Sequence, residues 1–345
     1  MAEMIDLRSD TVTKPSEEMR RAMYKAEVAD DSYDGDPTVI RLQELAAEKT
    51  GKESALFVAS GTMGNLCGVL SLTTPGQEVI LGDFSHQFLW EKGGSARVAG
   101  LVTHTIPFRD GWLDPQEVEA AIRPQTREAA PTGLICVEDT SNRGGGAVIP
   151  PEHLAKISEV AKRYHLPVYM DGARLFNAAV AMNRHAGDFT QFADAVSFCL
   201  SKGLGAPFGS LLCGSKDVIA RSISARQMLG GGMRQAGIMA AAGIVALKTG
   251  IDRLAEDHAS AQRLAQGLAE LFPGCIDQRT VETNMFFIKV AALGRSGPQL
   301  AEELRREGIL VFPTQPRMRL TTHCNVCSQD IDRALRVFAR LRQSI

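Results

Sequence analysis

One lysine in this sequence stands where a reactive amine can be held in place, after an apolar run and before a glycine-rich loop. The run is residues 196–210, VSFCLSKGLGAPFGS, and the lysine is Lys202. A strand that ends in a single amine and then turns keeps that amine at a fixed position. A fixed amine with a lowered pKa can form a Schiff base with a carbonyl compound. The alternative is an exposed, inert lysine on an ordinary loop, which is the commoner situation.

An aspartate at the end of a second predicted strand gives Lys202 a chemical partner. Asp171 closes the apolar stretch LPVYMD (166–171) and is followed by Gly172. By itself, Asp171 could simply cap the next helix. Together with a lysine at another strand end, it is the residue that pyridoxal phosphate requires, because a carboxylate keeps the pyridine nitrogen protonated and the ring able to accept electrons.

Two further side chains fit a reaction of this kind. His86 opens a predicted helix after the strand 78–82, where an imidazole could stack on a cofactor ring and exchange protons near neutral pH. Arg319 lies in a short predicted strand and could bind an amino-acid carboxylate with two hydrogen bonds. A structural histidine and an exposed arginine are the alternatives that this pattern leaves open.

The turn around Gly61 and Thr62 is suited to bind an anion. It joins a predicted strand, SALFV (54–58), to a long apolar helix that begins near Met63. Free backbone N–H groups and the helix dipole meet at such a turn, and a glycine lets the ligand approach closely. The turn lacks the lysine of a P-loop and a GxGxxG pattern, so the turn alone does not single out phosphate.

The elements that must position these residues alternate between strand and helix over some 160 residues. We predict strands at 54–58, 78–82, 101–106, 133–139, 166–171, 194–200 and 210–214, and helices between them, including one over about 86–98. This alternation predicts an α/β fold with a mainly parallel sheet that is covered by helices on both faces. Ligand sites in such folds lie at the carboxyl ends of the strands, where Lys202 and Asp171 are expected.

The domain organisation follows from the length and from the pattern after residue 250. A chain of 345 residues exceeds what one core usually supports. We predict an N-terminal arm over 1–15, a large domain over 16–250, and a small α+β domain over 251–345. The small domain should contain strands near 284–290 and 319–323 and a closing amphipathic helix over about 328–342.

Composition excludes several other classes of protein. The formal net charge is −2, from 38 basic and 40 acidic side chains, and charges of one sign are not grouped in runs. We therefore expect neither a nucleic-acid nor a membrane partner. Seven cysteines, mostly in apolar stretches, indicate buried thiols and a cytoplasmic protein. Cys324 and Cys327 form a lone CxxC pair, for which we expect no metal.

Long motifs spread over nearly the whole chain resemble the threonine aldolase family of fold-type-I pyridoxal-phosphate enzymes. The motifs that carry this resemblance are collinear with those of the family. They are IDLRSDTVTKP (5–15), SGTMGN (60–65), DGARLFNA (171–178), LSKGLGAP (200–207), GGGMRQAG (230–237) and RLTTH (319–323).

The resemblance implies a role for each residue named above and for several more. Lys202 would be the Schiff-base lysine, Asp171 the partner of the pyridine nitrogen, and His86 the residue that stacks over the ring. Enzymes of this family are usually tetramers built from dimers with shared active sites. The remaining implied roles are phosphate binding by Gly61 and Thr62, substrate carboxylate binding by Ser9 and Arg319, a place for Arg174 near the cofactor hydroxyl and the carboxylate, contact of Arg234 with the phosphate of a neighbouring subunit, and a place for Tyr33 near a shared site.

The sequence departs from the family pattern at three places. Glu128 stands where the family commonly has a histidine that handles the β-hydroxyl of the substrate. The family's ENTHN reads EDTSN here, with Asp139 and Ser141, and Gln227 replaces a usual lysine. The first two changes leave the preferred side chain and diastereomer of the substrate open, and the third affects an anion contact.

The resemblance implies reversible retro-aldol cleavage of an L-β-hydroxy-α-amino acid, such as L-threonine or L-allo-threonine, to glycine and an aldehyde. The base for the β-hydroxyl could be His86, a water that it positions, or Glu128. An aldolase specialised for phenylserine, and a racemase or β-eliminating enzyme with the same cofactor, are alternative functions. A noncatalytic protein that binds the cofactor is the alternative from another class.

Overall fold

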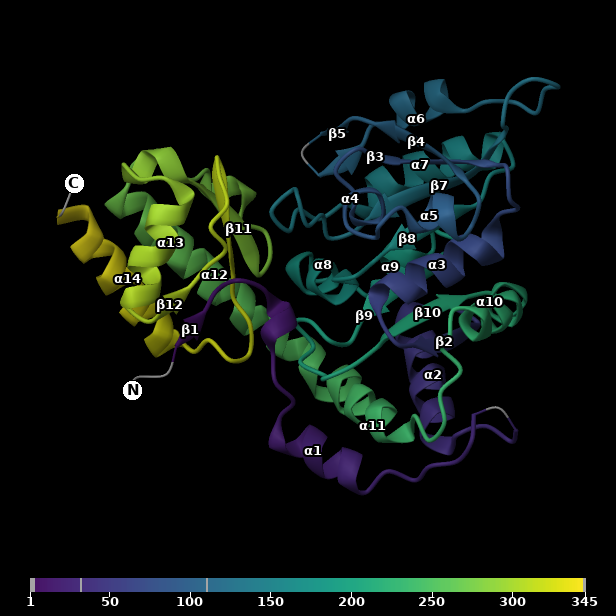
Figure 1. The fold of residues 1–345 in the computed structure, drawn as a ribbon, viewed down its shortest axis with the longest axis horizontal. Coiled ribbons are helices and arrows are strands. Elements are labelled where there is room, and N and C mark those ends of the chain that lie inside the picture. Colours follow the sequence, from purple (N-terminus) through teal and green to yellow (C-terminus); the bar gives the residue numbers. More distant parts are fainter. Residues whose placement is uncertain (1–3, 32, 110, 344–345) are drawn as a thin grey trace.

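The computed structural model of the protein describes residues 4–31, 33–109 and 111–343. Figure 1 shows a larger lobe built around a sheet and a smaller lobe that holds the first strand and the last helix. The long helix α12 (Ile251–Leu271) begins beside the larger lobe and runs into the smaller one. None of the helices in the described ranges is both long and apolar enough to cross a membrane.

A seven-stranded sheet forms the centre of the larger lobe. Strand β10 is antiparallel to both of its neighbours, and the other neighbouring strands pair in parallel, which confirms the prediction of a mainly parallel sheet. In spatial order the strands are β2 (Ser54–Val58), β10 (Ser210–Gly214), β9 (Ala195–Cys199), β8 (Val168–Asp171), β7 (Thr132–Glu138), β3 (Glu78–Gly82) and β4 (Val102–Ile106).

Apolar side chains cover both faces of this sheet, because successive residues of a strand point to opposite sides. In β3, Ile80 joins the core on one face, while Val79 and Leu81 join the core on the other. The second of these cores is covered by α3 (Gly61–Leu72) and α10 (Lys216–Met228). The first core is covered by α2 (Pro37–Thr50), α6 (Pro115–Ala121), α7 (Pro151–Arg163), α8 (Leu175–Ala181), α9 (Ala186–Thr190) and α11 (Gly237–Val245).

The smaller lobe has a core of its own, to which the N-terminal arm contributes Ile5 and Leu7. Strand β1 (Ile5–Asp6) pairs in parallel with β12 (Ile309–Leu310), so the N-terminal arm includes a strand that was not predicted from the sequence. The arm then passes to α1 (Glu17–Tyr24), which packs on α11. The remaining elements of this lobe are the antiparallel strands β11 (Met285–Lys289) and β13 (Arg317–Thr321) and the helices α13 (Gly297–Arg306) and α14 (Ser328–Gln343).

The predicted helix over 86–98 is broken into α4 (His86–Leu89) and α5 (Gly94–Arg97). The reason is local: Lys92 and Gly93 adopt φ values of 55° and 69°, a left-handed conformation that a right-handed helix cannot contain. A short hairpin follows, formed by β5 (Phe108–Arg109) and β6 (Trp112–Leu113).

The domain boundaries at residues 15 and 250 stay a prediction. Helix α12 shares both cores, since Leu254 belongs to the core of the larger lobe and Ala261 to that of the smaller. The helix is continuous with α11 through a π-helical segment at Ala246–Gly250. The two lobes are therefore joined by a stiff element as well as by the N-terminal arm.

Candidate active site

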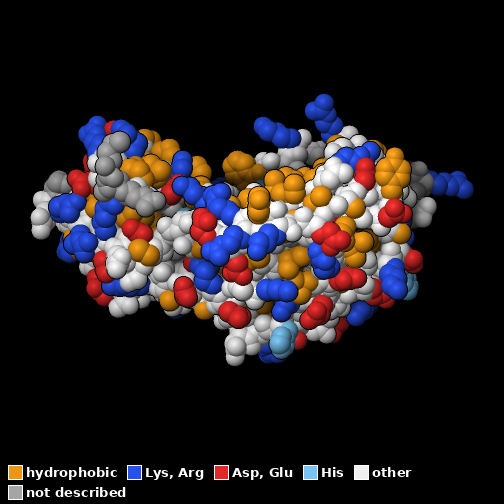
Figure 2. Space-filling model, turned by 90° about the horizontal axis from the view of Figure 1, so that it is seen from below, with side chains coloured by type: hydrophobic (Ala, Val, Ile, Leu, Met, Phe, Trp, Pro, Cys, Tyr) orange, Lys and Arg blue, Asp and Glu red, His pale blue; other side chains and the backbone are white. Residues whose placement is uncertain are grey.

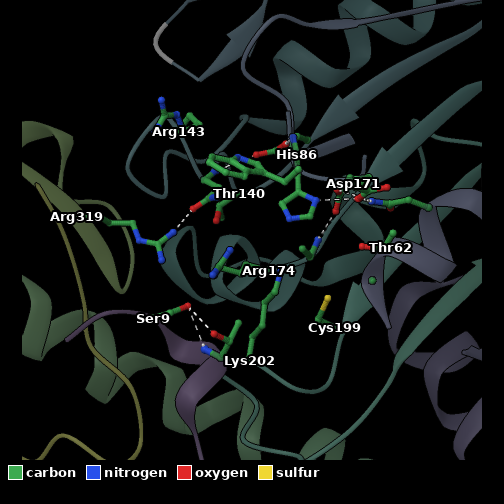
Figure 3. Close-up of a pocket in the computed structure, with 18 of the residues that line it drawn as sticks. Ser9, Thr62, His86, Thr140, Arg143, Asp171, Arg174, Cys199, Lys202 and Arg319 are labelled. Carbon is green, nitrogen blue, oxygen red and sulfur yellow. Dashed lines mark hydrogen bonds and ion pairs between the residues drawn. The ribbon is translucent and has the colours of Figure 1, made fainter. Parts of the chain in front are cut away.

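A cavity of about 480 Å³ lies where the two lobes and the N-terminal arm meet. Its walls come from the carboxyl-end loops of the central sheet, from the start of α3, and from the smaller lobe. Figure 3 shows the His86 ring in the middle of this cavity, with Lys202, Arg174 and Arg319 around it. Eight of the eleven residues predicted from the sequence line it: Ser9, Gly61, Thr62, His86, Asp171, Arg174, Lys202 and Arg319.

The backbone around Lys202 is tied to its surroundings. The Lys202 carbonyl accepts hydrogen bonds from the Thr13 hydroxyl (3.1 Å) and from the Gly205 N–H (2.9 Å). The Gly205 bond needs a turn with φ of 79°, a conformation that glycine adopts without strain. The amine is thus carried by a turn that both the N-terminal arm and the loop itself hold in place.

Asp171 is buried at the end of β8 and faces the cavity. Its Oδ2 accepts a hydrogen bond from Asn65 Nδ2 (2.9 Å), and its Oδ1 accepts one from the Ala173 N–H (3.2 Å). The capping alternative does not apply, because the residue at the N-cap of α8 is Arg174. The Asp171 carboxylate is therefore available to the cavity.

The start of α3 offers backbone donors to an anion. Ser60 caps the helix by accepting from the Met63 N–H, and the N–H groups of Gly61 and Thr62 have no partner within the helix. Glycine is required at position 61 by close packing, since a Cβ there would lie 2.9 Å from the sulfur of Cys199. A phosphate group fits this corner of the cavity.

Two arginines give the opposite side of the cavity a positive charge. Arg174 is buried and binds Asp10 through two hydrogen bonds of 2.6 and 2.7 Å. Arg319 donates to Asn142 and to the Arg8 carbonyl (2.9 Å), and its buried Nε has no partner within the described residues. Burial, together with the charge of Arg174, lowers the pKa of Arg319 to about 10. Arg319 thus remains cationic at neutral pH and can bind a substrate carboxylate.

His86 is held by two polar neighbours, Glu138 and Glu91. The backbone N–H of His86 donates to Glu138 Oε2 (2.6 Å), and its ring atom Nδ1 lies 2.8 Å from Glu91 Oε1. The hydrogen bond to Glu91 raises the pKa of His86, against the effect of burial. Burial and the charge of Asp171 raise the pKa of Glu138 to about 7. The cavity therefore contains two neighbouring groups, His86 and Glu138, whose pKa values are raised above their ordinary values.

Three of the predicted residues are not brought to this cavity. Tyr33 is 83% exposed, Glu128 is exposed on the segment that follows α6, and Arg234 pairs with Asp30 at 2.9 Å. None of the three lines the cavity within this chain. Their proposed roles at a shared site stay predictions.

Several lining or supporting residues were not predicted as site residues. Asp10 and Asn65 lie inside motifs that carried the family resemblance. Asp10 follows Ser9 directly, and Asn65 lies one helical turn after Gly61. Their roles depend on partners 164 and 106 residues away, Arg174 and Asp171, which the sequence pattern does not reveal. Other lining residues that were not predicted include Glu91, Glu138, Asn142 and Arg143.

Asp139, one of the departures from the family pattern, is buried without a cation. Its Oδ1 accepts from the Ile149 N–H (3.1 Å), and its Oδ2 has no partner within the described residues. Burial raises the pKa of Asp139 from 3.8 to about 8, and the charges of Glu282 and Glu138 add to the effect. Between these two pKa values the folded state binds more protons than the unfolded chain, so stability falls as the pH rises.

We expect the variant Asp139→Asn to remove this pH dependence. It should match the wild type near pH 4 and become increasingly more stable than it towards pH 8, by up to about 1.4 kcal/mol for each pH unit. Urea midpoints measured for both proteins from pH 5 to pH 8 would test this. A difference between the two that stays constant with pH would contradict the expectation.

The chain matches known proteins along nearly its whole length. Residues 6–293 match a family model described as beta-eliminating lyase. The low specificity L-threonine aldolase of Escherichia coli K12 is 43% identical over 329 residues, which cover 95% of this chain and 96% of that protein. Low-specificity L-threonine aldolase 1 of Arabidopsis thaliana is 42% identical, with 97% of this chain and 95% of that protein covered.

The fold matches solved structures as well. The threonine aldolase of Leishmania major aligns with a TM-score of 0.81 over 98% of this chain and 99% of that one, at 19% sequence identity. The fold is that of the fold-type-I pyridoxal-phosphate enzymes, as the sequence predicted. With 42–43% identity to two threonine aldolases over almost all of its residues, the chain belongs to the threonine aldolase family, within the beta-eliminating lyases.

Proposed function

We propose that this protein is a pyridoxal-phosphate-dependent aldehyde-lyase that reversibly cleaves L-threonine and L-allo-threonine to glycine and an aldehyde. One observation carries the proposal. Lys202, Asp171 and Arg319 line the same cavity, and no carboxylate of the described residues pairs with Arg319. A carbonyl-binding amine, a carboxylate for a pyridinium and a cation for an amino-acid carboxylate are thus combined in one site.

The residues present fit the cofactor. Lys202 would hold it covalently, the N–H groups of Gly61 and Thr62 would bind its phosphate, and Asp171 would pair with its ring nitrogen. His86 would lie against the ring. When bound, pyridoxal phosphate supplies an electron sink for the electron pair released as the Cα–Cβ bond of the substrate breaks.

The protein's own groups then bind and orient the substrate. Arg319, with the hydroxyl of Ser9, would bind the α-carboxylate and so fix the direction of the Cα–Cβ bond. Arg174, held by Asp10, adds positive charge beside this carboxylate. Nε2 of His86 would take the proton of the β-hydroxyl, directly or through a water. Glu128 lies outside the cavity of its own chain, so within one chain His86 is the better candidate.

The proposal is tested by comparing steady-state cleavage of L-threonine, L-allo-threonine and the two L-phenylserine diastereomers. We expect glycine and acetaldehyde from both threonine diastereomers. Glycine and benzaldehyde formed with much higher efficiency would favour a phenylserine aldolase instead. Formation of a keto acid and ammonia as the main products would contradict the aldolase assignment.

A second candidate is β-elimination or racemisation, and the match to a family model described as beta-eliminating lyase favours it. The names of the relatives at 42–43% identity favour the aldolase. A noncatalytic protein would bind the cofactor, lose its visible absorption band in Lys202→Ala, and cleave no β-hydroxy amino acid. The intact lysine, aspartate and arginine set argues against that function.

We also propose a cytoplasmic homotetramer, a dimer of dimers, in which Tyr33 and Arg234 lie near the site of a neighbouring subunit. Exposed apolar side chains support this assembly. Figure 2 shows the side of α1 and α11, where apolar groups gather between charged ones. In this part of the chain Tyr24 is 91% exposed, and Val28 and Ile238 are exposed as well. Such side chains are typical of surfaces that another subunit covers.

A further inference from the structure

The imidazole of His86 is bound by a buried carboxylate on one side and faces the cavity on the other. Its Nδ1 lies 2.8 Å from Glu91 Oε1, and the Glu91 side chain is only 3% exposed, against 35% for His86. Glu91 reaches this position because the chain reverses at Lys92 and Gly93 and does not continue α4. The pair is therefore a product of the break that separates α4 from α5.

Asn65 fixes the direction of the Glu91 carboxyl group. Burial raises the pKa of Glu91, but the hydrogen bond with the more basic imidazole of His86 favours the ionised carboxylate. One end of the Asn65 amide faces the carboxylates of Glu91 and Asp171, which only accept, so the opposite end is the oxygen Oδ1, and it accepts from the hydroxyl groups of Tyr169 (2.8 Å) and Ser197 (2.9 Å). The Asn65 NH₂ group must then donate to Glu91 Oε1 (2.7 Å) and to Asp171 Oδ2 (2.9 Å). One oxygen of Glu91 thus accepts from Asn65 and also faces His86, as expected for an ionised carboxylate.

These contacts determine which nitrogen of His86 carries the proton. An oxygen that accepts from Asn65 offers Nδ1 a lone pair and no hydrogen, so Nδ1 is the N–H of the neutral ring. Nε2 is then the nitrogen with a free lone pair. We infer that Glu91, oriented by Asn65, is a positioning residue that fixes the tautomer of His86 and makes Nε2 the base for the β-hydroxyl of the substrate. This inference rests on the proposed function.

The proton that leaves the β-hydroxyl of the substrate is taken up by His86. The O–H bond of the β-hydroxyl breaks, an Nε2–H bond forms, and the ring becomes an imidazolium whose charge the Glu91 carboxylate compensates. The proton leaves for Cα of the product or for water when the ring returns to neutral. The charged groups that face this ring are Glu91, Asp171, Glu138 and Lys202, and the raised pKa of His86 follows mainly from its bond to Glu91.

Two variants of Glu91 separate the roles of geometry and charge. In Glu91→Gln the amide cannot turn its NH₂ towards His86, because its other possible orientation would set it against the fixed NH₂ of Asn65. Its oxygen should therefore keep both hydrogen bonds and the tautomer, and only the negative charge is lost. In Glu91→Leu the hydrogen bond is lost too. Glu159→Gln, on the exposed side of α7, is the matched control for loss of a carboxylate.

The tautomer is read directly by ¹⁵N NMR of histidine-labelled apoenzyme and holoenzyme, with the spectrum of His86→Asn identifying the signals. We expect Nδ1–H for His86 in the wild type, in Glu91→Gln and in Glu159→Gln, and a mixture of tautomers in Glu91→Leu. Nε2–H in the wild type would overturn the inference. This readout does not depend on turnover, so an inactive wild type with Nδ1–H would contradict the proposed function and leave the role of Glu91 standing.

Kinetics of the holoenzyme with L-threonine provide the second readout. Glu91→Leu should lower kcat by about 5- to 10-fold with little change in KM, because only the fraction of His86 that keeps its proton on Nδ1 leaves Nε2 free to act as the base. Glu91→Gln should retain most of kcat, and the acidic limb of its kcat/KM profile should move to lower pH, because removal of the carboxylate lowers the pKa of His86. Equal losses in both variants without a shift of the profile would overturn the inference. If Glu91→Leu fails to fold, the profile of Glu91→Gln still decides.

Discussion

Replacing Lys202 with alanine is expected to lower kcat for cleavage of L-threonine by about 10³-fold or more, while leaving the protein folded. The loss is large because the amine would bind the cofactor covalently, and among the described residues no other lysine lines the cavity. Stability should change little, since the contacts that hold this turn are made by the backbone of residue 202. Glycine and acetaldehyde formation and the urea midpoint measure the two effects.

The control is Lys248→Ala, which removes an exposed lysine far along the chain. Borohydride reduction followed by peptide mass spectrometry should place the cofactor on residue 202 in the wild type and in this control. In Lys202→Ala no peptide should carry it. Turnover within 10-fold of the wild type in Lys202→Ala would refute the assignment of this lysine, since a 10-fold loss corresponds to only about 1.4 kcal/mol of the activation barrier.

The second large effect is expected at Asp10, the partner of Arg174. This ion pair is almost completely buried, with exposures of 5% for Arg174 and 0% for Asp10. In Asp10→Ala the guanidinium would be left buried without a counter-charge, which costs about 3–5 kcal/mol in comparable sites. The hydrogen bond from Asn284 Nδ2 to Asp10 (3.4 Å) would be lost too. We therefore expect a much lower urea midpoint and a less ordered arrangement of the residues around Arg174.

The stability lost in Asp10→Ala should depend on pH in a defined direction. Burial alone would raise the pKa of Asp10, but the charge and hydrogen bonds of Arg174 outweigh it and hold this pKa well below its ordinary value of 3.8. The pair therefore stabilises the protein above about pH 4 and loses its effect as the pH falls. The difference between the wild type and Asp10→Ala should narrow from pH 5 downwards, and a constant difference would contradict the explanation.

Asp277→Ala is the matched control for Asp10→Ala. It also breaks an aspartate–arginine pair, with Arg279 at 2.7 Å, but the arginine is 89% exposed and the aspartate half exposed. Water screens both charges there, and exposed ion pairs contribute little to the free energy of unfolding. We expect almost no change in the urea midpoint, so a loss like that in Asp10→Ala would show that burial is not the cause.

The sheet and the strand-end residues could be predicted because their signals are local. Each predicted strand is an apolar run bounded by turn residues, and the carboxyl ends of parallel strands meet at one edge. Lys202 and Asp171 follow from this geometry. The ion pair of Asp10 with Arg174 does not, since nothing in the neighbourhood of either residue indicates which of the other charged side chains it meets.

The helix predicted over 86–98 shows why other parts of the site could not be predicted. The sequence pattern there suits one helix to residue 98, but α4 ends at Leu89 and the backbone then turns left-handed at Lys92 and Gly93. Glu91 lies between the end of α4 and this turn, with its Oε1 2.8 Å from Nδ1 of His86. Glu128, in contrast, was considered for its place in a family motif, and it lies on an exposed segment outside the cavity of its own chain. The alignment of Glu128 with a functional position of the family therefore did not show that its side chain lies near the cavity.

The pairing of β1 with β12 has a consequence for biosynthesis. Ile5 leaves the ribosome about 300 residues before its partner Ile309, so the arm cannot take its place until nearly the whole chain has been translated. Because the arm carries Ser9 to the cavity and Asp10 to its ion pair with Arg174, the central sheet can form during translation, but a competent site cannot. A nascent chain released early would therefore have the sheet and Lys202 and yet be inactive.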